Sequence, residues 1–318
     1  MGAGSMNITS ENKTNAHVAV FEFEGRPAAP IKREVKISVP GKIAIAIVLF
    51  WVAMCFVGPL VAPYREADIV ADQTFAPAGE SCSPFRKGVC SFHLLGTDYL
   101  GRDVFSRVLY GSRTTMGISV AATLLAYVIG VTFGITAAIR GPKLDMVLSR
   151  INDVFISIPS IMLGLVVIAA VGTSIPILIV TAGAIYSTTV FRLSRAFAMD
   201  VMVTDFVEAA RARGEGLWWM LYREILPNIV MPLATDCGIR LIYIVLFIAS
   251  LSFLGLGVQP PVADWGGLVR ENIQGIAYAS WAPIAPALAI SSLTISINLI
   301  VDEMSAKSGG KLAKSLLK

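Results

Sequence analysis

The stretch that decides the fold is Val154–Phe191, which reads VFISIPSIMLGLVVIAAVGTSIPILIVTAGAIYSTTVF and holds no charged residue over 38 positions. A membrane-spanning helix needs about 20 apolar residues, so this run is too long for one span. Its middle, Gly172-Thr173-Ser174-Ile175-Pro176, is rich in residues that break helices. The stretch therefore predicts two transmembrane helices joined by a tight turn.

The rest of the chain carries the same signal. It is 55% hydrophobic and 15% charged, with a mean hydropathy of +0.70, whereas soluble domains carry about 25% charged residues. This composition excludes two soluble domains and predicts an all-α integral membrane protein. Together with the hairpin, four further uncharged runs make six transmembrane helices: Ile43–Tyr64, Thr114–Ile139, Leu241–Ala263 and Asn272–Val301.

The basic residues predict the orientation. An even number of spans places both termini on one side, and cytoplasmic loops carry an excess of Lys and Arg. With both termini cytoplasmic, eighteen of the 26 basic residues lie inside and seven outside, while Arg240 falls in a span. We therefore expect both termini in the cytoplasm. The net charge of +4 is modest and gives no reason to expect a nucleic-acid partner.

These spans divide the chain into segments. Because the first apolar run begins only at residue 43, we interpret it as an uncleaved span and not as a secretory signal. The expected segments are a partly disordered cytoplasmic head (1–42), the first span (43–64), an external loop (65–113), a core of five spans (114–303) with a cytoplasmic loop (192–228), and a cytoplasmic tail (304–318).

The external loop has two features of its own. Residues 94–110 have helical spacing, with one apolar face and one polar face that carries Arg102, Asp103, Ser106 and Arg107, and with Thr97 or Asp98 as the cap. This pattern predicts an interfacial helix, either near an outer gate or as a plain connector. Cys82 and Cys90 also lie here, and an oxidising compartment would favour a disulfide between them.

The cytoplasmic loop is longer than a connection requires. Its residues 205–228 predict a helix, a break at Gly214, and a second helix that Pro227 ends. The second helix carries an apolar stripe that includes Leu217 and Trp218. An exposed apolar stripe that contains tryptophan is usually covered by another surface. The loop therefore either docks on a partner or folds back on its own bundle.

Polar residues at membrane depth are costly and tend to face cavities or partners. They are candidates for a translocation pathway, and Asp236 and Arg240 are spaced to pair on one helix face. The alternative is a structural role, as in helix packing through Gly130 and Gly134. The pathway candidates are Asn152, Asp153, Ser157, Ser160, Asp236, Arg240, Ser250 and Ser252.

Catalytic chemistry finds no support in the sequence. Gly309-Gly310-Lys311-Leu312 lacks the spacing and the hydroxyl residue of a phosphate-binding loop. With two histidines in the chain, no metal cluster or nucleophilic triad is predicted. We therefore expect no enzyme, no metal site and no cofactor in this chain.

Several motifs resemble a known family. Glu208-Ala209-Ala210, followed by three residues, Gly214 and then Leu226-Pro227, resembles the EAA loop of ABC importer permeases. Four other stretches resemble the C-type subunit of the peptide and nickel branch, and the resemblance extends from about residue 40 to about 302. These stretches are residues 95–98 with 101–103 and 106–107, residues 157–159, residues 251–261, and Trp265-Gly266.

The resemblance implies a type I ABC importer permease fold in the bacterial cytoplasmic (inner) membrane. It implies a non-catalytic, multi-pass subunit for di- or oligopeptide import. Its implied partners are a homologous B-type permease, two ABC ATPases that bind ATP and Mg, an extracytoplasmic substrate-binding protein and the lipid membrane. The implied ATPase-coupling residues are Glu208, Ala209, Ala210, Gly214, Leu217, Leu226 and Pro227.

Two other functions remain open at this stage. A secondary transporter or channel without ATPase partners would favour inverted repeats and broken helices lined with acidic residues, and the sequence shows no convincing repeat. A membrane-anchored scaffold without a transport path is the third possibility.

Overall fold

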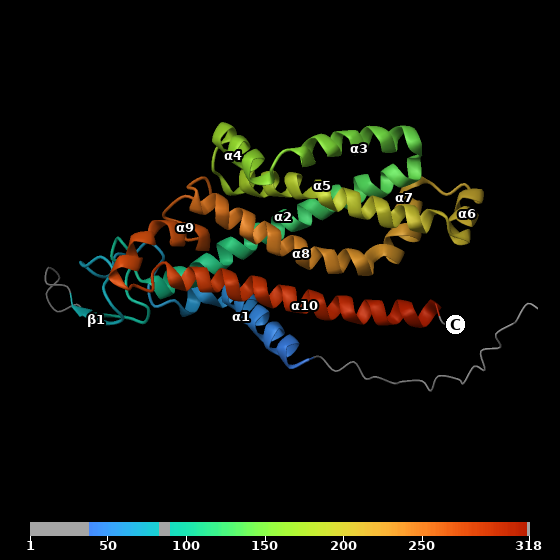
Figure 1. The fold of residues 1–318 in the computed structure, drawn as a ribbon. Helices are drawn as coiled ribbons and strands as arrows, with labels where there is room; N and C mark the ends of the chain where they lie inside the picture. Colours follow the sequence, from blue (N-terminus) through green and yellow to red (C-terminus); the bar gives the residue numbers. More distant parts are fainter. Residues whose placement is uncertain (1–37, 83–89, 317–318) are drawn as a thin grey trace, which may run out of the picture. The chain divides into compact units, whose positions relative to one another are not determined.

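The computed structural model describes residues 38–82 and 90–316, with the side chains of 38–79 and 92–306. Two short strands, β1 (Gly79–Cys82) and β2 (Cys90–His93), form an antiparallel hairpin. A π-helical turn, η1 (Met220–Ile225), and a 3₁₀ helix, η2 (Ile273–Tyr278), accompany the α-helices. These helices (Figure 1) are α1 (Val39–Val61), α2 (Val104–Arg140), α3 (Pro142–Ser157), α4 (Ser160–Val171), α5 (Ile175–Met202), α6 (Asp205–Ala212), α7 (Leu217–Trp219), α8 (Leu226–Phe253), α9 (Trp265–Glu271) and α10 (Ile284–Leu316).

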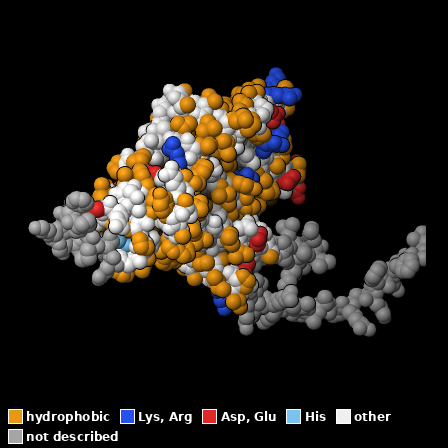
Figure 2. All heavy atoms as spheres, turned by 60° about the vertical axis from the view of Figure 1, so that its left-hand side comes forward, with side chains coloured by type: hydrophobic (Ala, Val, Ile, Leu, Met, Phe, Trp, Pro, Cys, Tyr) orange, Lys and Arg blue, Asp and Glu red, His pale blue; other side chains and the backbone are white. Residues whose placement is uncertain are grey.

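Five helical segments in the described part are long and apolar enough to span a membrane, and α3 with α4 forms a sixth, broken candidate. Hydrophobic side chains are spread over the whole of the described face drawn in Figure 2, as lipid contact requires. Ser38, which caps α1, donates its backbone N–H to Oε1 of Glu303 on α10 at 3.0 Å. The start of α1 and the late turns of α10 therefore lie on the same side, as an even number of spans predicts.

The predicted hairpin is confirmed at its turn, because α4 ends at Val171 and α5 begins at Ile175. The third span is itself broken, which the sequence pattern did not predict. The α3 and α4 axes differ by 87° at the break between them. Ile158 takes an extended conformation there, because the residue before a proline such as Pro159 is disfavoured in the α region.

The predicted interfacial helix is also wrong. Residues 104–110 are the first turns of α2, which begins ten residues before the predicted second span. Asp103 caps the helix, accepting from the backbone N–H of Ser106 at 2.7 Å, so the cap is neither Thr97 nor Asp98. The polar face points inward, and Arg102, Asp103, Ser106 and Arg107 are buried.

Ion pairs explain how these polar residues are buried. Asp98 lies 2.6 Å from Nε of Arg102 and 2.7 Å from Nη1 of Arg107. Both arginines also contact Oε2 of Glu271 at 2.9 Å. A buried charge needs such partners, and Glu271 comes from α9, more than 160 residues further along the chain. The network therefore joins the external loop to α9.

The boundaries of the last two spans differ from the prediction. Residues Leu217–Phe253 form one continuous helical segment, so Pro227 does not end a helix. It is the second residue of α8 and directly follows the π-helical turn η1, where the regular α-helical hydrogen-bond pattern is already interrupted. The last span begins at Ile284, since η2 and a left-handed turn at Ala279 occupy the residues before it.

The α2–α5 pair makes the most extensive helix contact in the described structure. It depends on small residues, as the packing interpretation of Gly130 and Gly134 predicts. A Cβ atom at Gly134 would lie 2.7 Å from the carbonyl oxygen of Phe191, and one at Gly130 would lie 2.7 Å from that of Ser187. The two backbones approach too closely for a side chain at either position.

We predict that Gly134→Ala destabilises the protein. The added methyl group collides with the α5 backbone, and overpacking costs about 1–3 kcal/mol. The matched control on the same helix is Gly117→Ala, because a Cβ atom there meets nothing within 4 Å. Thermal unfolding in detergent should show a lower midpoint for Gly134→Ala and no loss for Gly117→Ala. Equal midpoints would contradict the close approach of the helices.

Trp265 anchors the external end of the bundle. Its indole N–H donates to the carbonyl of Val108 at 3.0 Å, and its backbone N–H donates to the hydroxyl of Thr115. Its ring meets that of Trp51 edge-on, with centroids 4.8 Å apart. The side chain is fully buried. Trp265 therefore fixes α9 against α1 and α2.

Asp264 caps α9 and makes this end sensitive to pH. Its carboxylate accepts from the backbone N–H of Gly267 at 3.1 Å, but burial raises its pKa to about 6. A carboxyl whose pKa is higher in the folded state than in the unfolded state stabilises the fold while it is protonated. This contribution falls as pH rises from about 4 to about 6.

We therefore predict that the wild type loses stability between pH 5 and pH 7.5 relative to Asp264→Asn. The asparagine keeps a capping oxygen and does not ionise. Unfolding midpoints of the two proteins at both pH values measure the difference. The same midpoint change with pH in both proteins would show that Asp264 does not titrate in this range.

The two cysteines of the external loop lie opposite each other in the hairpin, since Cys82 pairs with Cys90 in the backbone register. Their side chains lie outside the described residues, so the disulfide stays a prediction. Cys55 and Cys237 are free and half-buried.

Candidate functional site

Helix α6 presents one face inward and one face outward. Val207 and Ala210 are fully buried and pack with Met220 against the cytoplasmic ends of α2 and α5. Glu208 and Ala209 are exposed on the other face. The short helix is therefore held by its apolar side while its acidic side stays open.

A left-handed turn follows α6. Gly214 has φ +80°, and a Cβ atom there would meet nothing within 4 Å. The glycine is thus required by the backbone conformation and not by crowding. Arg213, just before it, approaches Glu224 of η1 to 3.5 Å.

Aromatic side chains lie exposed beyond this turn. Trp218 is 61% exposed and Tyr222 52% exposed, and their rings stack with centroids 5.8 Å apart. The guanidinium of Arg223 lies 5.1 Å from the ring centroid of Trp219, which is 42% exposed. We call Phe206, Glu208, Ala209, Trp218, Trp219 and Tyr222 the cytoplasmic surface.

The predicted apolar stripe divides between two environments. Leu221 and Ile225 are buried in a cluster with residues of α2, α5 and α8. Leu217 and Leu226 are half-buried, and Pro227 is exposed. The second cytoplasmic helix therefore folds back on the bundle through Leu221 and Ile225, whereas Trp218 remains exposed.

Helix α8 carries an ion pair at membrane depth, in which Asp236 is buried and Arg240 is partly exposed. Nη2 of Arg240 lies 2.9 Å from Oδ1 of Asp236, one turn earlier on the helix. Tyr127 on α2 donates its hydroxyl to Oδ2 of the same carboxylate at 2.7 Å. The predicted pairing is confirmed, and Tyr127 completes it from a distant part of the sequence.

Two tyrosines lie beside the pair, and we call Asp236, Arg240, Tyr243 and Tyr186 the polar strip. Arg240 lies 5.7 Å from the ring centroid of Tyr243, which is about half exposed. Tyr186 on α5 donates to the backbone carbonyl of Tyr243 at 3.3 Å. Sequence reasoning missed all three tyrosines, although a tyrosine hydroxyl within a span needs a partner and could have drawn attention.

The other pathway candidates lie apart from this pair. Asp153 and Ser157 are exposed on α3, and Ser160 is half-buried at the start of α4, so the two serines flank the break. Ser250 donates to the carbonyl of Leu246 within α8, and Ser252 is buried.

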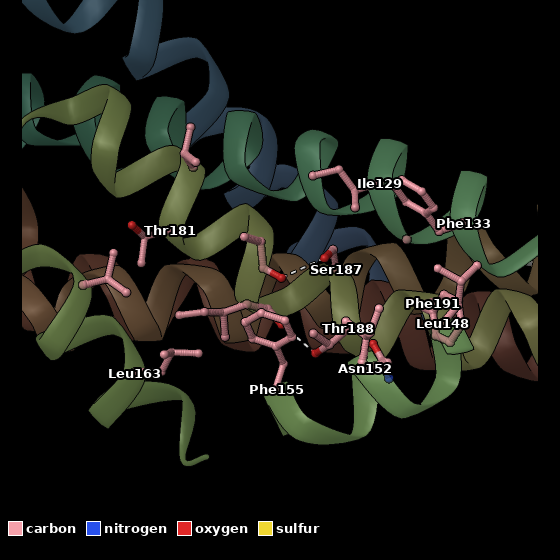
Figure 3. A pocket seen from close by; sticks show the side chains of 16 residues that line it. Ile129, Phe133, Leu148, Asn152, Phe155, Leu163, Thr181, Ser187, Thr188 and Phe191 are labelled. Atoms are coloured by element: carbon pink, nitrogen blue, oxygen red, sulfur yellow. Dashed lines mark hydrogen bonds between the residues drawn. The ribbon is translucent and has the colours of Figure 1, made fainter. Parts of the chain in front are cut away.

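Asn152 lines a cavity of about 450 Å³ (Figure 3). Its walls come from α2, α3, α4 and α5, and no residue of α8 contributes. The described contacts therefore do not bring Asn152 together with Asp236 and Arg240.

The described side chains hold no group of three or more His, Cys, Asp or Glu that could bind a metal ion.

Part of the chain matches a known protein family. Residues 130–306 match the family "Binding-protein-dependent transport system inner membrane component". This range begins within α2 and extends into α10, so it includes α6 and the polar strip.

Curated relatives agree with this match. The glutathione transport system permease protein GsiD of Pectobacterium atrosepticum is 36% identical over 68% of this chain and 72% of that protein. The dipeptide transport system permease protein DppC of Escherichia coli is 32% identical over 83% of this chain and 86% of that protein.

A solved structure has a similar fold. A chain of the MetNI methionine ABC transporter, in an inward-facing conformation, matches with a TM-score of 0.51 at 20% identity. The match covers 63% of this chain and 95% of that chain.

Proposed function

The chain belongs to the family of binding-protein-dependent transport system inner membrane components, and from this membership we propose that it imports di- or oligopeptides with the energy of ATP. Its class is that of a non-catalytic, multi-pass permease subunit of a binding-protein-dependent ABC transporter. Peptide import is supported by relatives whose names specify dipeptide or glutathione transport.

The observation that carries the proposal is the cytoplasmic surface. Exposed tryptophans outside the bilayer need a cover, and the acidic, outward face of α6 lies beside them. We assign this surface to an ABC ATPase subunit. Glu208, Ala209 and Gly214 would form the contact, while Ala210, which is buried, would hold α6 on its own bundle.

Coupling then requires a connection to the spans. Helix α6 packs on Met220, which begins η1, and η1 continues without a break into α8. A displacement of α6 on ATP binding would therefore reach Asp236 and Arg240 through one helix. This two-state element would be biased by nucleotide bound to the partner.

The pathway is assigned to the polar strip of α8 and to the α3–α4 break. A partly exposed Arg240 within a span is costly against lipid. Non-helical backbone at membrane depth, as at Ile158 and Pro159, is tolerated only against protein or a water-filled cavity. Both features would face a homologous permease, with the substrate path between the two chains.

The remaining partners follow from the proposed class. Two ATPase subunits would bind ATP and Mg, an extracytoplasmic binding protein would deliver the peptide, and this chain would hold no cofactor.

The test is purification from native membranes in mild detergent, with identification of the co-purifying proteins by mass spectrometry. We expect a second permease, ATPases with phosphate-binding loops, and vanadate-sensitive ATP hydrolysis. Reconstituted with the binding protein, the complex should take up labelled dipeptide only with ATP. A chain that moves solute alone and without ATP would instead be a secondary transporter or channel.

A further inference from the structure

The bend between α3 and α4 leaves a long apolar cavity beside α5. Its wall follows α5 from Val180 to Phe191, which is about 16 Å of helix. Its floor is α2 at Ile129, Gly130 and Phe133. The cavity is lined mainly by aliphatic and aromatic side chains, as Figure 3 shows, so it suits an extended hydrocarbon chain.

One polar group in the cavity has no partner. Asn152 is buried, and its Nδ2 makes no hydrogen bond to any described residue. The nearby hydroxyls of Ser187 and Thr188 donate to carbonyls of their own helix. A buried donor without an acceptor costs about 1–3 kcal/mol. An occupant that brings an oxygen acceptor would remove this cost.

The cavity opens on the outer surface of the helices. Phe133 is 50% exposed, Phe155 49% and Val180 57%, and all three line it. We place these positions against lipid, whereas the α3–α4 break at Ile158 and Pro159 lies against the partner permease. Acyl chains are therefore the apolar molecules available to fill the cavity.

The cytoplasmic end of the cavity is basic. Arg192 follows the wall residue Phe191 on α5, and Arg140 lies two turns beyond Phe133 on the same face of α2. Arg195 is neutralised by Asp145, but within the described side chains no carboxylate pairs with Arg140 or Arg192. Two unpaired cations at this end attract an anionic headgroup.

We propose that this cavity binds one anionic phospholipid of the cytoplasmic leaflet. One acyl chain fills the slot, Asn152 donates to a lipid oxygen, and Arg140 and Arg192 contact the phosphate. The site is separate from the α8 polar strip and does not depend on which solute is transported.

The test uses the transporter with its co-purifying subunits in nanodiscs of equal phosphatidylglycerol and phosphatidylcholine. Native mass spectrometry counts the lipids that each complex retains. Ala184→Phe fills the cavity from α5, and Val166→Phe is its control, since Val166 is 67% exposed on α4 and does not line the cavity. Arg140→Gln and Arg192→Gln change exposed positions and leave the fold intact.

We expect the wild type and Val166→Phe to retain one phosphatidylglycerol, and Ala184→Phe to lose it. Each arginine substitution should lower the preference for phosphatidylglycerol about fivefold, because one cation near an anionic surface contributes about 1 kcal/mol. If the Ala184→Phe complex does not assemble, the phosphatidylglycerol preference of the two arginine variants still tests the proposal. Equal retention of both lipids, equal retention by the two phenylalanine variants, or a wild-type complex without bound lipid would overturn the proposal.

Discussion

The substitution Glu208→Lys is expected to lower ATP-driven dipeptide uptake about a hundredfold while the protein still inserts into the membrane. Glu208 is exposed on α6, so its replacement leaves the packing of Val207 and Ala210 intact. Reversing a charge in a docked interface costs several kcal/mol, and about 3 kcal/mol reduces the docked population about a hundredfold. Uptake into membrane vesicles and co-purification of the ATPases measure the two effects.

The matched control is Asp200→Lys. Asp200 is also exposed at the cytoplasmic end of the bundle, near the end of α5, and its replacement makes the same change in charge. We expect it to leave uptake within about twofold, since single exposed charges contribute little. Normal uptake by Glu208→Lys, or equal losses in both variants, would remove α6 from the proposed coupling contact.

The second large effect is expected at the α8 ion pair. Asp236→Leu leaves Arg240 unpaired at membrane depth and removes the shorter of the two hydrogen bonds that the Tyr127 hydroxyl donates. Breaking a buried pair costs about 3–5 kcal/mol. Thermal unfolding of the purified complex should show a large fall in the midpoint. For comparison, Arg213→Ala breaks two long, solvent-exposed pairs, with Glu215 and Glu224, and should cost less than about 1 kcal/mol.

The double variant Asp236→Leu/Arg240→Leu separates stability from transport. Replacing a whole buried pair by apolar residues is often neutral or stabilising, so the midpoint should recover. Uptake should stay lost if Arg240 faces the substrate path. A double variant with wild-type uptake would show that the pair serves the fold alone.

The sequence predicts the spans well where one local signal decides. The cluster at 172–176 breaks the long apolar run, and the structure breaks there too. Gly214 marks the turn after α6 for the same reason, because a positive φ favours glycine. Such signals act within a few residues and do not require knowledge of the tertiary structure.

The predicted span boundaries are wrong where buried charges pair with residues that are distant in the sequence. The gap between Arg113 and Arg140 predicts a span that begins at Thr114, yet α2 begins at Val104 and includes Arg107. Arg102 and Arg107 are buried against Asp98 and Glu271. A rule that ends spans at charges cannot anticipate a partner on α9.

Site residues divide in the same way. Glu208 and its neighbours are recognisable from a local motif, whereas the partner of Asp236 is Tyr127, more than 100 residues away. The sequence also does not predict which side of the second cytoplasmic helix is buried, because Leu221 and Trp218 are both apolar. Tertiary packing buries the first and exposes the second.

The unbroken run from Leu217 to Phe253 has a mechanical consequence. At 1.5 Å per residue it measures about 55 Å, so it is a stiff lever arm that begins at the proposed ATPase contact and ends near the outer face. A small displacement of its cytoplasmic end near Leu217 therefore produces a larger displacement of its outer end near Phe253. The π-helical turn at Met220–Ile225 lies near the end at which the force would be applied, so it belongs to the segment that passes the displacement on.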